Sequence, residues 1–170
     1  EGMGSGSQAY GFVIGQSFGQ GDFHLEDAYG EFHINPNIHL RWGQFIFPTV
    51  LSSQADSGTL LMINQTIMGG WFRAWDLGAM LHGEFNQFYW ALGIQNGIDG
   101  IADEYRFSLR AEFRGNGGAG GGGEFRQEGA LGVAPGLAYT VGIAYTDDDG
   151  LSPSTGPSLK TEVLAIDAAA

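Results

Sequence analysis

An all-β antiparallel fold is predicted by three properties of the sequence. First, several segments alternate apolar and polar residues with a period of two, which places one kind of side chain on each face of a strand. Second, 30 of the 170 residues are Gly, a composition that disfavours long helices and suits turns and crowded strands. Third, charged residues make up only 15% of the chain, and no apolar run is long enough for a transmembrane helix.

The segment 103–114 has the clearest alternation. One face carries apolar and aromatic side chains, namely Tyr105, Phe107, Leu109, Ala111 and Phe113. The other face is polar and mostly ionic, with Glu104, Arg106, Ser108, Arg110, Glu112 and Arg114. The ionic face is too charged for a packed core, whereas a strand that is apolar outside and charged inside suits a membrane barrel around a water-filled lumen.

The same alternation recurs in residues 28–34, 38–43, 88–95 and 137–146. Turn-forming residues separate these runs at 19–22, 35–37, 86–87 and 96–97. We count eight or nine strand candidates in all. The sequence therefore predicts one transmembrane antiparallel β-barrel domain over residues 1–170.

Three segments depart from this alternation. Residues 48–77 form a long apolar connection, so we expect local structure there, such as a helical turn, folded into the lumen or placed at a subunit contact. The glycine-rich residues 115–123 are interpreted as a flexible tip between two strands. The acidic residues 147–150 are interpreted as a solvated turn, since their spacing matches no EF-hand loop that would bind Ca²⁺.

The charge and the scattered reactive residues exclude several function classes. A formal net charge of −12 argues against binding of nucleic acid by a basic surface. The chain has no Cys and no Gly-x-Ser-x-Gly motif, and His24, His33, His39 and His82 lack helical metal-ligand spacing. His33 and His39 could meet across the turn at 35–37, but a polar face explains them equally well. We therefore predict no enzymatic activity, no cofactor and no metal site.

The segment Leu40-Arg-Trp-Gly-Gln-Phe-Ile-Phe-Pro48 resembles a strand and turn of the phosphate-selective porin O/P family. The resemblance continues in order through residues 26–29, 76–83, 91–97 and 105–113. It implies a homotrimeric porin of the bacterial outer membrane with about sixteen strands, of which this chain would be an incomplete piece. Its partners would be outer-membrane lipid, further copies of itself and small hydrophilic solutes that diffuse through it, including anions such as phosphate.

The residues expected to meet those solutes are the charged ones on the polar face. The predicted pore-lining residues are Arg41, Arg106, Arg110, Arg114, Glu31, Glu84 and Glu112. Arg73 and Asp76, which close the long connection, are candidates for a constriction. A guanidinium group presents a planar fork to phosphate or carboxylate. The alternative interpretation is that these ions pair with one another and stiffen the wall.

The charge pattern differs from that of the resembled family, whose anion selectivity is attributed to lysines and an arginine ladder. This chain has one lysine, Lys160, and its arginines are interleaved with acids. Two other functions remain open on the sequence alone. One is a structural barrel that anchors envelope components and conducts little, and the other is a soluble all-β binding domain.

Overall fold

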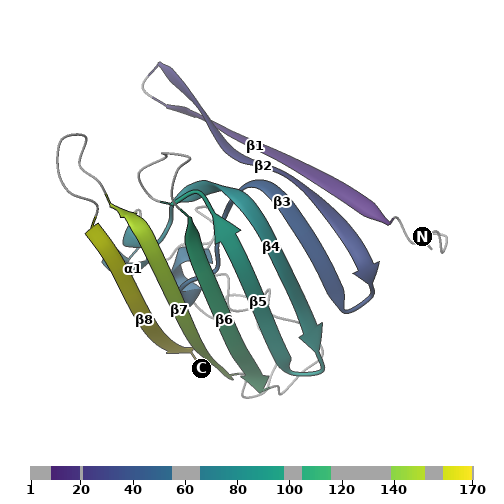
Figure 1. Ribbon diagram of the computed structural model, residues 1–170. Coiled ribbons are helices and arrows are strands. Elements are labelled where there is room, and N and C mark those ends of the chain that lie inside the picture. The colour runs from purple at the N-terminus through teal and green to yellow at the C-terminus, as the bar shows by residue number, and fades with distance from the viewer. Residues whose placement is uncertain are drawn as a thin grey trace.

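The computed structural model describes residues 9–19, 21–54, 66–97, 105–115, 139–151 and 159–169. These residues form a single antiparallel sheet of eight strands in sequence order (Figure 1). The strands are β1 (Tyr10–Gly19), β2 (Asp22–Asn35), β3 (Ile38–Ile46), β4 (Trp75–Phe85), β5 (Phe88–Gln95), β6 (Arg106–Gly115), β7 (Tyr139–Leu151) and β8 (Leu159–Ala169). The predicted all-β antiparallel fold is thereby confirmed.

The sheet is curved, and its two edges do not meet. Figure 1 shows β3 to β8 as a curved wall, with β1 and β2 extending together from one side of it. β1 and β8 are the end strands of the order, and within the described residues they do not pair with each other. The structure therefore shows an open sheet.

Three of the predicted turns join neighbouring strands as short hairpins. β1 meets β2 around Gly21, and β4 meets β5 at Asn86, both of which have a positive φ angle, 88° and 55°. Gly and Asn are the residues that enter this region at the lowest energetic cost. β2 meets β3 at the predicted 35–37 turn, where the Asn35 side chain accepts a hydrogen bond from the Asn37 backbone N–H at 2.9 Å.

The register confirms the predicted separation of faces. Opposite partners in β5, β6 and β7 place Leu92, Leu109 and Tyr145 in one row and Gly93, Ser108 and Thr146 in the next. The first row is exposed, whereas Ser108 and Thr146 are buried. In a soluble sheet the apolar face is the one that is covered. Here the arrangement is inverted.

A small apolar cluster lies on the covered face over β3 to β5. It consists of Phe45, Phe47, Met80, Tyr89 and Ala91. These residues are few compared with the exposed apolar side chains of the opposite face. The cluster packs the chain that follows β3 against the sheet, as described below.

The connection between β3 and β4 contains local structure, as expected. A 3₁₀ turn, η1 (Leu51–Gln54), and a short helix, α1 (Ile67–Trp71), contact each other. Thr66 caps α1 by accepting a hydrogen bond from the Gly69 backbone N–H at 3.1 Å. No helix in the described part of the chain is long and apolar enough to cross a membrane.

One sequence interpretation is corrected by the structure, and one falls outside it. The acidic residues 147–150 form no turn, because β7 continues through them to Leu151 and Asp147 and Asp148 pair with β8. The alternation continues there, since Asp148 lies on the covered face opposite Arg106. The glycine-rich tip beyond Gly115 lies outside the described residues.

Candidate functional site

The candidate site is the covered, polar face of the sheet. Strand alternation directs every second side chain of β2 to β8 toward this face. Its buried polar members on these strands are Asp76, Gln95, Arg106, Ser108, Arg110, Glu112, Thr140, Thr146 and Asp148. Burial of so many charged groups requires that each be paired or hydrogen-bonded. The pairs on this face therefore decide what the face can do.

Arg110 of β6 is the centre of this face, and its side chain has no exposed surface. Its Nε and Nη2 atoms donate to Glu112 Oε2 at 3.0 and 2.8 Å. Its Nη1 and Nη2 atoms donate to the two carboxylate oxygens of Asp167, each at 2.9 Å. A further bond of 3.0 Å runs from Nη1 to the Thr49 carbonyl. The guanidinium thus uses all five of its donors within the protein.

The chain after β3 crosses the polar face and is held there by Arg110 and Asp167. Phe47 lies over β5, where a Cβ atom added at Gly93 would meet its ring. Next, Thr49 accepts the bond from Arg110, and the Leu51 backbone N–H donates to Asp167 Oδ2 at 3.0 Å. The described start of the long connection is thereby fixed across β5, β6 and β8.

Two neighbouring charge clusters continue the face along β6. Arg114 Nε donates to Glu112 Oε1 at 2.6 Å, and its Nη1 lies 3.4 Å from Glu84 Oε2. The Arg114 guanidinium also lies over the Tyr89 ring, 4.8 Å from its centroid. Among these groups Glu84 is the most accessible, with 44% of its side chain exposed.

At the other end of β6, Arg106 binds Asp76 and Gln95. Its Nη2 lies 3.1 Å from Asp76 Oδ2 and donates to Gln95 Oε1 at 2.7 Å. Asp76 also accepts a hydrogen bond of 2.9 Å from the Gly97 backbone N–H. Arg73, the other constriction candidate, lies with its guanidinium over the Trp75 ring at 5.4 Å. Asp76 therefore belongs to the wall of the sheet, while Arg73 precedes it.

The remaining predicted pair lies across β2 and β3. Arg41 donates from Nε and Nη2 to Glu31 Oε2 at 2.9 and 2.6 Å, and its guanidinium stacks on Tyr29 at 4.1 Å. Both side chains keep about a fifth of their surface exposed, 22% for Arg41 and 19% for Glu31. This pair is more accessible than the enclosed Arg110 pairs.

All seven predicted pore-lining residues thus lie on the same face. Four of them, Arg110, Glu112, Arg114 and Glu84, are joined by successive ion pairs, and Arg106 pairs separately with Asp76 at the other end of β6. Sequence reasoning did not identify Asp167, Gln95 or the Thr49 carbonyl as their partners. Of these three, only Gln95 could have been expected from the sequence, because the alternation of β5 places its side chain on the polar face.

Residues able to hold a metal ion occur on the same face, near the hairpin of β2 and β3. Glu31, His33 and His39 offer ligand atoms that lie within 4.8 Å of one another. Comparison with protein-family models, curated proteins and solved structures found no match for this chain.

Proposed function

We propose that this sheet is part of the wall of a bacterial outer-membrane β-barrel through which small hydrophilic solutes diffuse. The observation that carries the proposal is the inversion of the sheet, with its charged face covered and its apolar face exposed. A lipid-facing wall requires that arrangement, since outer-membrane barrels present an apolar band outward and polar residues inward. A soluble sheet of this size would expose its charges instead.

The exposed face has the extent that a membrane wall needs. On β6 and just before it, exposed apolar side chains run from Tyr105 to Phe113, about 26 Å along a strand at 3.3 Å per residue. That length is of the order of the ~25 Å apolar band of outer-membrane barrels. Beyond Tyr145 on β7 the same face becomes charged at Asp147, which pairs with Lys160 at 3.2 Å. The apolar band therefore ends in groups suited to water or headgroups.

The polar face supports passage of hydrophilic solutes more than selection of one solute. Enclosed pairs such as Arg110–Asp167 would stiffen the wall and hold the loop inward, as in the wall-pairing interpretation. Accessible groups such as Glu84 and the Glu31–Arg41 pair would face the solute. Charges of both signs across a pore favour polar solutes over apolar ones. The resemblance of residues 40–48 to the porin O/P family supports small anions, such as phosphate, among them.

Conductance across a planar lipid bilayer tests this function. The protein extracted from membranes in detergent is expected to add stepwise conductance, with a reversal potential that a salt gradient makes measurable. An unheated sample is expected to migrate as a large species on a gel and to shift on boiling, as a homotrimer requires. Membrane insertion without current under any gradient would favour the structural barrel. A protein that stays soluble without detergent would favour the soluble binding domain.

A further inference from the structure

Three histidines lie side by side on the polar face of β2, β3 and β4. The register places His33 opposite His39, and His39 opposite His82. Opposite residues of an antiparallel pair point to the same face. Their ring centroids are accordingly close, 4.7 Å for the first pair and 5.3 Å for the second. The row brings together three strong metal-ligating side chains from separate strands.

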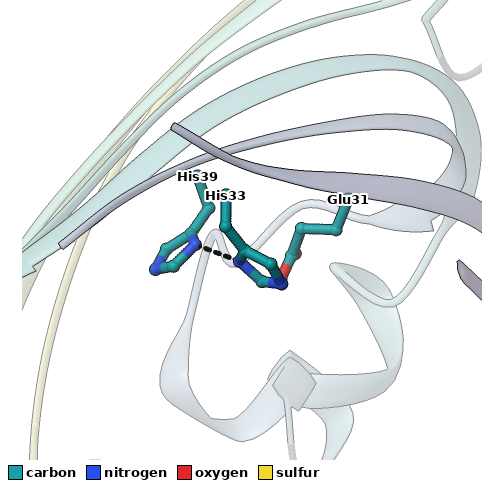
Figure 2. Close-up of side chains that lie close together, drawn as sticks. All are labelled: Glu31, His33 and His39. Carbon is teal, nitrogen blue, oxygen red and sulfur yellow. Dashed lines mark hydrogen bonds between the residues drawn. The ribbon is translucent and has the colours of Figure 1, made fainter. Parts of the chain in front are cut away.

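The nitrogen atoms of two of these rings face each other. His33 Nδ1 and His39 Nδ1 are 2.6 Å apart, and Figure 2 shows the two rings joined by this contact, with Glu31 beside His33. In such a contact one nitrogen donates its proton and the other accepts it through its lone pair. The accepting lone pair therefore points into the gap between the rings. A neutral imidazole with a directed lone pair is the commonest protein ligand for metals.

Glu31 completes the group and is itself held in place. Arg41 and His82 both bond to its Oε2 atom, from Arg41 Nη2 at 2.6 Å and from His82 Nε2 at 3.1 Å. Outer contacts of this kind fix the orientation of a metal-ligating carboxylate. Glu31, His33 and His39 are each partly exposed, so the group can be reached from the polar face.

We propose that Glu31, His33 and His39 bind a divalent cation of the Zn²⁺ class, with His82 positioning Glu31. Two imidazoles and one carboxylate form a ligand set that Zn²⁺ accepts, with a fourth position left for water. Nitrogen ligands favour Zn²⁺, Cu²⁺ or Ni²⁺ over Mg²⁺ or Ca²⁺, which prefer oxygen. This inference is independent of solute passage, and it revises the expectation that the chain has no metal site.

The required adjustment of the two rings is small. Two nitrogen atoms at 2.0–2.1 Å from one Zn²⁺ ion in tetrahedral geometry stand about 3.4 Å apart. The observed 2.6 Å separation would therefore widen by less than about 1 Å. Rotation of the two side chains would supply such a movement, and the donating ring would take the tautomer that carries its proton on Nε2, which leaves an Nδ1 lone pair on each ring for the metal. The positive charge of Arg41 is already offset by Glu31, so the neutral imidazoles provide most of the binding.

Calorimetric titration of the full chain in detergent micelles with ZnCl₂ tests this site. One Zn²⁺ per chain is expected for the unmodified protein, with no comparable binding of Mg²⁺. His33→Ala and His39→Ala are each expected to weaken Zn²⁺ binding at least tenfold. His24→Ala is the matched control, because His24 lies on the same strand near its other end, opposite Ser17 of β1, and should leave binding unchanged.

Equal binding of Zn²⁺ and Mg²⁺, or no stoichiometric binding of Zn²⁺, would overturn the proposal. It would also be overturned if both variants at 33 and 39 bound Zn²⁺ as tightly as the unmodified protein. A second readout needs no variant and so does not depend on whether a variant folds. Bound Zn²⁺ should raise the thermal unfolding midpoint of the unmodified protein as its concentration increases, and Mg²⁺ should not.

Discussion

Arg110 of β6 and Asp167 of β8 are joined by two hydrogen bonds of 2.9 Å, although β7 lies between their strands. The pair reaches over Gly142 of β7. A Cβ atom added at Gly142 would collide with Arg110 Nη2 and would lie 2.6 Å from Asp167 Oδ1. Glycine at this position therefore keeps open the path through which β6 and β8 are connected.

Gly142→Val is expected to destabilise the protein because its side chain would separate Arg110 from Asp167. Overpacking of a filled site costs about 1–3 kcal/mol, and loss of the ion pair would add to that. The free energy of unfolding, measured in urea, gives the change in stability. The temperature or denaturant concentration at which the unheated gel species disappears gives a second measure. Gly11→Val is the matched control, because no atom lies within 4 Å of a Cβ added there. Equal loss of stability in the two variants would contradict this account of Gly142.

Arg110→Ala is expected to lower the free energy of unfolding more than removal of any exposed charge. It would leave Glu112, which is 2% exposed, with Arg114 as its remaining cation, and Asp167 without both of its bonds to Arg110. Removal of one partner from a buried ion pair typically costs about 3–5 kcal/mol. Arg110→Lys should recover little of this, because an ammonium group cannot reproduce the five-donor pattern. Free energies of unfolding from urea titration would provide the measurement.

Lys160→Ala is the control for that prediction. Lys160 is 54% exposed and pairs with Asp147 at 3.2 Å, a type of pair whose removal costs about 0–1 kcal/mol.

The same Arg110 variant should also release the chain after β3, since the bond to Thr49 is lost. Faster proteolytic cleavage within residues 47–54 is expected for Arg110→Ala and not for Lys160→Ala. Unchanged cleavage would contradict the anchoring role of Arg110.

Leu109→Arg is expected to impair membrane insertion. Leu109 lies on the exposed apolar face of β6, between Leu92 of β5 and Tyr145 of β7. A cation on the lipid face of an outer-membrane barrel costs about 2–4 kcal/mol near the bilayer centre. The fraction of protein that folds into lipid vesicles, measured by the gel shift on boiling, should fall. Leu109→Phe should insert normally, and equal insertion of the Arg variant would contradict a lipid-facing role.

The alternation of residues 103–114 was enough to predict the two faces of β6, because strand geometry assigns side chains to faces without any knowledge of neighbours. Partners across the sheet were not predictable in the same way. Asp167 is 57 residues from Arg110, and its contact depends on the register of β7. The row of histidines shows both cases. The turn at 35–37 indicated that His33 and His39 could meet, while His82 joins them through the pairing of β3 with β4.

The acidic residues of β7 show why the sequence misled at one point. A run of Asp followed by Gly is typical of a turn, and local preference alone favours that interpretation. Instead, Asp148 is 4% exposed on the polar face opposite Arg106, and Asp147 pairs with Lys160 of β8. Pairing of β7 with both β6 and β8 therefore overrode the local turn preference, and no feature near residue 147 indicated these partner strands.

Glu84→Gln is expected to shift the ion selectivity of the proposed pore toward anions. Glu84 is the most accessible acid of the β6 clusters, 44% exposed and 3.4 Å from Arg114. The substitution removes one negative charge from the accessible polar face while it keeps the size of the side chain, so Arg114 would attract anions more strongly. The reversal potential in a KCl gradient across a planar bilayer measures the shift. Glu162→Gln is the matched control, because Glu162 pairs in register with Asp147 on the opposite face of the sheet. A shift of the same size in both variants would mean that overall protein charge, and not the polar face, sets the selectivity. No shift with Glu84→Gln would place Glu84 outside the solute path.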